Sequence, residues 1–346
     1  MRGPYPAGVT RARAARRLAT AAAYGGGGLG LLGGSLYAVM KAQAAWARRQ
    51  IGNATEAPPV ADGTYGGGLP GEPLALLVLG DSAAAGYGML EPLDTPPAML
   101  ASGLSHIAGR PVRVCSVARV GGQSADLQAQ LDRGLTHRPD VAVLVVGVND
   151  VTHTVRPSES VRLLEAAVRR LRGAGVEVVV GTCPDMGTLA PVAQPLREVA
   201  RRWSRRLAAA QTIAVVEAGG RSVSLGSLLG PSFALAPHEL FGPDRFHPSV
   251  AGYASMVAAL LPSVASAAGV WDEEEADAAD RWDSAQHDGL VLPVSFAAAE
   301  AAALDGTEVS AARVAGRDRG PRGRWAELQH RVRRPMPAVG DPDTVG

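Results

Sequence analysis

The chain has 346 residues, which leaves room for one domain of ordinary size plus extra segments. Its composition is that of a globular protein, with 47% hydrophobic and 19% charged residues, and its formal net charge is +1. This balance produces no whole-molecule field, which excludes attraction of nucleic acid through net positive charge. The two cysteines form no metal-binding pattern, so we expect no structural zinc site and interpret Cys115 and Cys183 as buried free thiols.

The N-terminal region carries a membrane signal. Residues 18–40 contain no charged side chain and can cross the roughly 30 Å hydrocarbon core of a bilayer as a helix. Arginines cluster in the basic arm that precedes this segment (residues 1–17), and fewer basic residues follow it. Because positive charge is retained on the cytoplasmic side, the pattern predicts a membrane anchor with the main domain outside the cytoplasm.

Two alternatives to an uncleaved anchor stay open. Ala42-Gln43-Ala44 has the small-residue pattern of a signal-peptide cleavage site, so the protein could be secreted. A cytoplasmic chain with a hydrophobic arm is the other alternative. Residues 51–73 are rich in Pro, Gly and Ala, and we expect them to be a flexible linker between the membrane and the main domain. No pattern in the sequence indicates an oligomeric state.

From residue 74 onward, short apolar runs alternate with amphipathic segments. Such runs are typical of strands buried on both faces of a parallel sheet. We expect strands at Leu74–Leu79, Val112–Val117, Val141–Val148, Val176–Val180 and Ile213–Val216. The segments between and after them predict helices at Ser124–Thr136, Ser158–Leu171, Leu196–Ala210 and Pro248–Val264.

This alternation predicts an α/β fold, a three-layer α/β/α sandwich with a five-stranded parallel sheet and right-handed crossovers. Residues 74–268 are expected to form one domain, because no second pattern or internal repeat interrupts them. Residues 269–346 differ in composition, with an acidic run followed by a basic stretch and a Pro-rich end. We expect a C-terminal tail of low order there.

Two candidate motifs follow the first two strands. Gly80-Asp81-Ser82 comes directly after the first strand, and the segment VGGQS (120–124) follows the second. Ligands bind at the carboxyl ends of strands in open α/β sheets, and a helix N-terminus offers N–H groups to an anion. A glycine at 121 or 122 lets the backbone approach a ligand. Each motif alone also fits an ordinary turn or helix cap.

The other two motifs supply an amide and an imidazole. Asn149 stands in GVND (147–150) at the end of the third strand, where its side chain can donate to a developing oxyanion. Asp244 and His247 stand in DRFHP (244–248) before the last helix. An imidazole can take a proton from a serine hydroxyl, and a carboxylate on its other nitrogen fixes the tautomer.

Together the four motifs resemble those of the SGNH hydrolase family, also called GDSL esterases and lipases. That family's signature residues Ser, Gly, Asn and His occur in this order and match Ser82, Gly122, Asn149 and His247, the last with Asp244. The resemblance covers about residues 74–268 and implies a flavodoxin-like version of the three-layer sandwich.

Two points of the match depart from the family pattern. The first block, GDSAAAG, fits the GDSxxxG form through Gly86 but lacks the Leu of GDSL. In the second block, either Gly121 or Gly122 could be the donor. Gly122 is preferred because Gln123-Ser124 then resembles the polar pair that follows the family's glycine.

The resemblance implies a serine ester hydrolase with a catalytic triad and an acyl-enzyme intermediate. Ser82 would attack an ester carbonyl, His247 would remove the hydroxyl proton, and Asp244 would hold the imidazole. The oxyanion hole would consist of the N–H groups of Ser82 and Gly122 and the side-chain amide of Asn149. No metal or organic cofactor is expected.

Three function classes fit these residues. The first is an esterase or lipase acting on a small-molecule or lipid ester. The second is a carbohydrate O-deacetylase of the cell envelope, which suits a domain tethered outside the membrane. The third is a non-catalytic binding module, which is disfavoured because none of the four signature residues is missing. Aromatic residues are few near the motifs, which disfavours a broad platform for stacking sugars.

Overall fold

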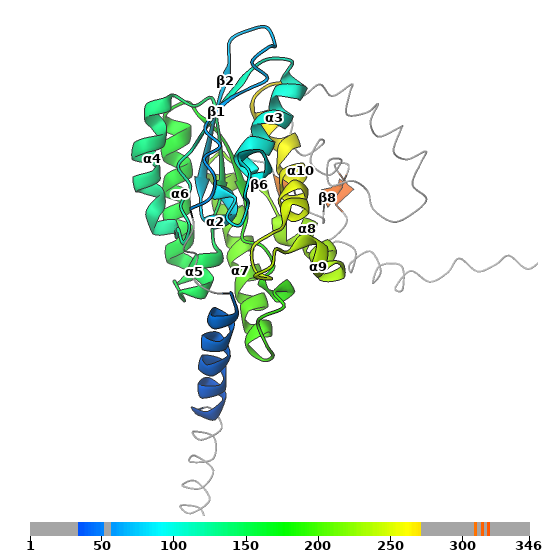
Figure 1. Cartoon of the computed structure of the whole chain (residues 1–346). Coiled ribbons are helices and arrows are strands. Elements are labelled where there is room, and N and C mark those ends of the chain that lie inside the picture. Colours follow the sequence, from blue (N-terminus) through cyan, green and yellow to red (C-terminus); the bar gives the residue numbers. More distant parts are fainter. Residues whose placement is uncertain (1–33, 52–56, 271–307, 310–312, 315–316, 319–346) are drawn as a thin grey trace, which may run out of the picture.

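The fold is built around a seven-stranded sheet with the order β1-β3-β2-β4-β5-β6-β7 (Figure 1). The computed structural model describes residues 34–51, 57–270, 308–309, 313–314 and 317–318. The strands are β1 Gly63–Tyr65, β2 Leu74–Gly80, β3 Val112–Ser116, β4 Val141–Val145, β5 Glu177–Gly181, β6 Arg221–Val223 and β7 Glu308–Val309. A separate antiparallel pair consists of β8 Arg313–Val314 and β9 Arg317–Asp318.

Five consecutive strands of the sheet, from β3 through β2, β4 and β5 to β6, are parallel, which confirms the predicted fold class. Two further strands extend this core. The antiparallel edge strand β1 lies within the range that the sequence suggested as a linker. At the other edge β7, from the expected tail, pairs in parallel with β6.

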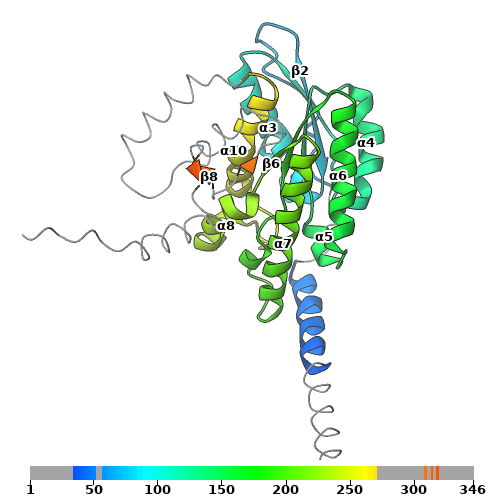
Figure 2. The same cartoon turned by 180° about the vertical axis from the view of Figure 1, so that it is seen from behind.

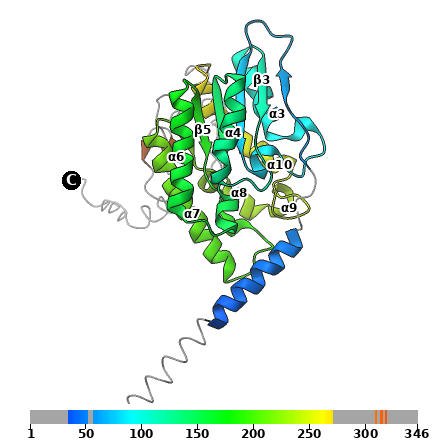
Figure 3. The same ribbon diagram turned by 90° about the vertical axis from the view of Figure 1, so that its left-hand side faces the viewer.

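Helices cover both faces of the sheet (Figures 1 and 2). α4, α6 and α7 form one layer, onto which Figure 3 looks, while α3 and α10 pack on the other face with α8 beside them. The longer helices are α3 Pro96–Ala108, α4 Leu127–Gly134, α6 Pro157–Gly173, α7 Leu196–Glu217, α8 Leu225–Leu235 and α10 Val250–Ala267. Shorter ones are α2 Ser82–Ala85, α5 Val148–Thr152, α9 Pro237–Leu240 and the 3-10 turns η1 Pro92–Asp94, η2 Ser124–Asp126, η3 Leu135–His137 and η4 Met186–Thr188.

The apolar side chains of β2 pack alternately into two separate hydrophobic cores. Leu77 and Leu79 point to the core under α4 and α6, and Leu76 and Val78 point to the core under α3 and α10. All seven β2 residues are buried. A strand covered by helices on both faces has no reason to alternate apolar with polar residues, which explains its continuous apolar sequence.

The strand expected at Ile213–Val216 is wrong, because these residues form the last turns of α7. The helix buries Leu207, Gln211, Ala214 and Val215 at helical spacing and leaves Ile213 59% exposed. The β-branched run therefore follows the 3.6-residue period of the helix before it. The fifth parallel strand is β6, only three residues long, which begins after Gly219 and Gly220.

The proposed membrane segment lies mostly outside the described residues, which begin at residue 34. Residues 34–51 form a helix that projects from the lower end of the domain (Figures 1 and 3). Gln43 of this helix bonds the backbone at Gln194 and Leu196, and Ala47 is buried. Within the described part of the chain one helix, α10, is long and apolar enough to cross a bilayer, but it is 61% buried and serves as a core helix.

Two buried glutamines close the strand ends on the carboxyl side of the sheet. Gln130 of α4 accepts from the Gly80 N–H (2.8 Å) and donates to the Gly80 carbonyl (2.9 Å). Gln211 of α7 accepts from the Cys183 N–H (2.8 Å) and donates to the carbonyl of Val146 (3.0 Å). They satisfy backbone groups at places where the strand ladder stops, and so hold the strand ends against the helices.

Gln130→Leu should lower the free energy of unfolding by about 2 kcal/mol, because the buried N–H of Gly80 loses its acceptor. Urea denaturation followed by circular dichroism measures this change. Gln128→Leu is the matched control on the same helix, because its side chain bonds Arg170 at the exposed surface, and it should change stability by less than about 0.5 kcal/mol. Equal effects of the two substitutions would contradict the role given to Gln130.

Candidate active site

Ser82 stands in a tight turn between β2 and α2. Gly80 has φ +132°, and a Cβ atom there would lie 1.9 Å from the carbonyl oxygen of Val145, so only glycine fits. Asp81 is the N-cap of α2, and its Oδ1 accepts from the Ala83 N–H at 2.9 Å. Ser82 is thereby the first residue of the helix, where its own N–H has no acceptor within the helix.

His247 comes back to Ser82 from the loop before α10. Its Nε2 lies 3.0 Å from Ser82 Oγ, and its Nδ1 lies 2.6 Å from Asp244 Oδ2. Asp244 also shapes the loop locally, because its Oδ1 accepts from the N–H groups of Phe246 (2.9 Å) and His247 (3.0 Å). Arg245, between them, adopts φ +54°. The turn thus aligns carboxylate, imidazole and hydroxyl in one hydrogen-bonded row.

The electrostatics of this row favour a charged carboxylate. Burial alone would raise the pKa of Asp244, but hydrogen bonds from the His247 ring and from the Phe246 and His247 N–H groups hold it below its ordinary value. A carboxylate at Nδ1 keeps that nitrogen protonated, so Nε2 is free to accept from a hydroxyl. Ser82 and His247 are only 7% and 8% exposed, which keeps bulk water from competing for these bonds. The arrangement can therefore move the Ser82 proton onto the imidazole.

Gly122 and Asn149 lie together next to the turn that holds Ser82. A Cβ atom on Gly122 would lie 2.8 Å from the carbonyl oxygens of Gly80 and Arg119 and 3.5 Å from Asp81 Cα, so the two turns pack at backbone distance. The Gly122 N–H donates to the Arg119 carbonyl at 2.9 Å, and Asn149 Nδ2 donates to the Gly122 carbonyl at 3.0 Å. The choice between Gly121 and Gly122 as an oxyanion donor stays a prediction.

A buried polar cluster behind these two residues ties three segments together. Asp150 Oδ2 accepts from the hydroxyls of Ser124 (2.5 Å) and Ser160 (2.6 Å), and its Oδ1 accepts from the Ser124 N–H (3.1 Å). Asp150 is 1% exposed and the two serines are equally buried. The carboxylate therefore joins the glycine loop, α5 and α6, and fixes the register in which Asn149 reaches Gly122.

Aromatic residues surround His247 more closely than the sequence suggests. The ring of Tyr87 lies 4.5 Å from the imidazole and that of Phe246 lies 4.9 Å from it. Tyr253 of α10 is fully buried, and its hydroxyl donates to the Tyr87 carbonyl at 2.9 Å. Sequence reasoning missed Tyr87 and Tyr253. The available signal was their position, one just after the Ser82 motif and one just after the His247 motif, in a chain with 4% aromatics.

Asp81 differs from the other acidic groups of the site because its charge is poorly compensated. It is 1% exposed, and its Oδ2 has no hydrogen-bond partner. Burial raises the pKa of Asp81 to about 6, although the Ala83 N–H and the positive form of His247 pull it down.

In the described part of the chain no three His, Cys, Asp or Glu side chains are grouped to hold a metal ion.

The raised pKa of Asp81 should make the free energy of unfolding depend on pH. Its pKa is raised from about 4 in the unfolded chain to about 6 in the folded one, so the folded state binds more protons between these values. The contribution of Asp81 to the free energy of unfolding is greatest below pH 4, falls as the pH rises to 6, and stays low at higher pH. The unfolding free energy of Asp81→Asn minus that of the unmodified protein should thus increase by about 2–3 kcal/mol from pH 4 to pH 7. Urea denaturation at both pH values measures it, and a constant difference would contradict the shift.

Comparison with known proteins identifies the family of this chain. Residues 78–255 match the GDSL-like lipase/acylhydrolase family. The chain is 41% identical over 249 residues to the GDSL-like esterase Rv1075c of Mycobacterium tuberculosis, and the match covers 68% of this chain and 78% of that protein.

Similar solved structures include TesA, with 22% identity and a TM-score of 0.43, covering 53% of this chain and 93% of TesA. They also include Axe2, an acetylxylan esterase from Geobacillus stearothermophilus, with 22% identity and a TM-score of 0.43, covering 54% of this chain and 91% of Axe2. The family match spans the strand ends and loops that hold Ser82, Gly122, Asn149 and His247, all of them described above. Because of the family match and the 41% identical relative, the chain belongs to the GDSL-like lipase/acylhydrolase family and is a serine ester hydrolase.

Proposed function

We propose that the protein cleaves an acyl ester through a Ser82–His247–Asp244 triad and a covalent acyl-enzyme. The observation that carries the proposal is the continuous row of hydrogen bonds from Asp244 Oδ2 to His247 Nδ1 and from His247 Nε2 to Ser82 Oγ, at 2.6 and 3.0 Å. Both distances are within the reach that proton transfer requires. Ser82 and His247 are buried and Asp244 is half-buried, and the depressed pKa of Asp244 keeps its carboxylate charged at neutral pH.

The reaction follows from these positions. Ser82 Oγ attacks the ester carbonyl carbon while His247 Nε2 takes the hydroxyl proton. The tetrahedral intermediate collapses, the bond to the alcohol oxygen breaks, and the imidazolium gives its proton to that oxygen. Water then attacks the acyl-enzyme, His247 takes a proton from it, and the acid leaves as Ser82 recovers its proton. Asp244 stays ionised throughout and stabilises the imidazolium.

The oxyanion would be bound by donors that converge beside Ser82. The Ser82 N–H is free at the start of α2. Asn149 Nδ2 carries two hydrogens, of which one is used by the Gly122 carbonyl, so the other is available. The Gly122 N–H joins this set when it shares or releases its bond to the Arg119 carbonyl. A carbohydrate O-deacetylase would use the same atoms, and that alternative stays a prediction.

We also propose that the domain is held at a membrane, outside the cytoplasm, by residues 18–40. Support comes from the charge distribution of the sequence and from the described end of that segment. There Leu36, Tyr37 and Val39 are 50%, 60% and 46% exposed, so no part of the described domain covers them.

Labelling with a fluorescent fluorophosphonate tests the nucleophile. The unmodified protein should be labelled, and Ser82→Ala should lose the label and at least about 10⁴-fold in kcat/KM on 4-nitrophenyl butyrate, because within the described residues no other hydroxyl is bonded to His247. Ser255→Ala is the control, since that hydroxyl only bonds the Ala251 carbonyl of its own helix. Equal labelling of Ser82→Ala and the unmodified protein would overturn the assignment.

Removal of the Asn149 amide should affect the transition state more than substrate binding. Asn149→Ala is expected to lower kcat by about 10²–10³-fold with little change in KM, as the loss of one oxyanion donor does elsewhere. Thr152→Ala on the same helix is the matched control, because its hydroxyl bonds only the Asn149 carbonyl and the exposed His153 ring. Steady-state kinetics measures both variants, and a loss confined to KM would contradict the oxyanion role.

A further inference from the structure

An apolar cavity opens directly beside the triad, and Ser82 and His247 form part of its wall. It encloses about 90 Å³, whereas one water molecule needs only about 10–15 Å³ of such space. Most of the side chains around it are aliphatic or aromatic, and Asp81 and Asp185 are the carboxylates among the lining residues. Three of the four phenylalanines of the whole chain, Phe233, Phe241 and Phe246, line it. Most phenylalanines of the chain therefore lie at the cavity beside Ser82.

One wall of the cavity is a single face of α8. Leu225, Leu229 and Phe233 are four residues apart, so they form a stripe along the helix, and they are 2%, 9% and 8% exposed. Glycines on a neighbouring face bring the helix close to the loop after β5. A Cβ atom on Gly226 would lie 3.1 Å from the Asp185 nitrogen, and one on Gly230 would lie 3.7 Å from Asp185 Cβ.

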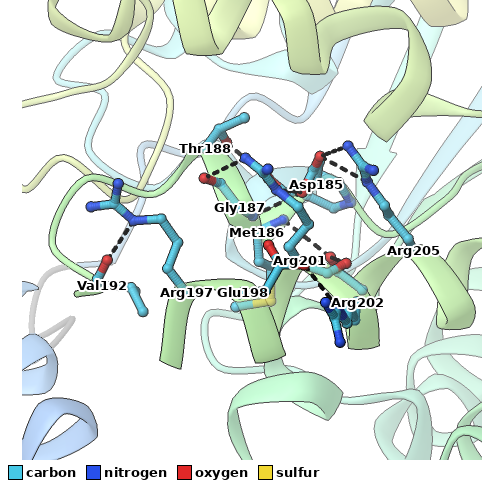
Figure 4. Close-up of polar contacts among 12 residues, drawn as sticks. Asp185, Met186, Gly187, Thr188, Val192, Arg197, Glu198, Arg201, Arg202 and Arg205 are labelled. Atoms are coloured by element: carbon cyan, nitrogen blue, oxygen red, sulfur yellow. Dashed lines mark hydrogen bonds and ion pairs between the residues drawn. The ribbon is translucent and has the colours of Figure 1, made fainter. Parts of the chain in front are cut away.

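A second, adjoining wall is the loop that holds Met186 and Leu189, and ion pairs and hydrogen bonds attach this loop to α7. Asp185 Oδ2 accepts from Arg205 Nε (3.1 Å) and Nη2 (2.7 Å), and its Oδ1 accepts from the Gly187 N–H (2.8 Å). Arg201 donates to the Gly187 carbonyl at 3.3 Å. Figure 4 shows these arginines of α7 reaching the loop.

These bonds give the second wall a fixed position. The Asp185 side chain is 5% exposed, so its pairing with Arg205 is sheltered from water on the carboxylate side. Asp185 is one of the residues that line the cavity, and its charge is paired with the guanidinium of Arg205. The cavity lined by α8 and this loop is therefore a preformed, largely apolar site rather than one that a ligand must open.

We propose that this cavity is the acyl site of the reaction and that it takes a straight chain of about four to eight carbon atoms, from butyryl to octanoyl. This inference rests on the proposed function. In the acyl-enzyme the acyl chain stays attached to Ser82 while the alcohol leaves, so a pocket with buried walls suits the chain that stays. Leu229 and Phe233 are the residues that limit its length. Acetyl would leave the cavity empty and forgo its apolar contacts.

A chain-length series measures the preference directly. The full-length protein is assayed with 4-nitrophenyl acetate, butyrate, hexanoate, octanoate and dodecanoate. Each buried methylene contributes a few-fold, so kcat/KM for hexanoate should exceed that for acetate by about tenfold or more and should fall again at dodecanoate. Leu229→Trp fills the cavity and should lower the hexanoate-to-acetate ratio about tenfold.

Two further variants separate a pocket effect from a folding effect. Leu235→Trp makes the same change at the 88% exposed end of α8 and should leave the ratio as it is. Phe233→Ala enlarges the cavity and should raise the dodecanoate-to-hexanoate ratio about fivefold, which gives a second reading if Leu229→Trp does not fold. Circular dichroism establishes which variants are folded.

The outcomes distinguish this inference from the function on which it rests. Hydrolysis with acetate preferred, or ratios unchanged in folded Leu229→Trp and Phe233→Ala, would overturn the acyl site and leave the Ser82 mechanism intact. Absence of hydrolysis of every ester, together with no fluorophosphonate labelling that depends on Ser82, would overturn both.

Discussion

The turn at the end of β2 must reverse the chain sharply and still leave no buried backbone group without a partner. Gly80 meets the first demand with its positive φ, and Gln130 meets the second by bonding both its N–H and its carbonyl. The Asp81 N–H completes the turn by donating to the Val145 carbonyl of the neighbouring strand. Because β4 and the glycine loop pack against this same turn, the positions of Asn149 and Gly122 depend on it as well.

Two of the three carboxylates at the site have hydrogen-bond donors on both oxygens, and the third does not. Asp150 is surrounded by hydroxyls and an N–H, and Asp244 by an imidazole and two N–H groups. Asp81 has one of its oxygens unpartnered, and its ionisation opposes folding at neutral pH. Because Asp81 caps the helix that begins at Ser82 at a cost in stability, the local geometry at Ser82 matters more than maximal stability.

Much of the fold and of the candidate site could be predicted because short, continuous stretches of sequence determine it. The strands buried on both faces, such as β2 and β4, are continuous apolar runs, and the motifs around Ser82, Asn149 and His247 stand at strand ends or before the last helix. The strand β6 was not predictable, since it is short and its Arg221 is buried by pairing with Glu177 of β5 at 2.7 Å. Gln130 and Tyr253 likewise act across long sequence distances, and a glutamine or tyrosine within a helix has no local pattern that reveals its partner.

The base and the hydroxyl stand 165 positions apart in the chain, yet they touch. In the proposed mechanism, a nascent polypeptide that lacks the segment before α10 would have the Ser82 hydroxyl but no imidazole to accept its proton. Ester cleavage would then begin only after this segment and α10 have packed against the rest of the domain. With the proposed location outside the cytoplasm, this order would postpone ester cleavage until the polypeptide has reached the compartment in which it folds.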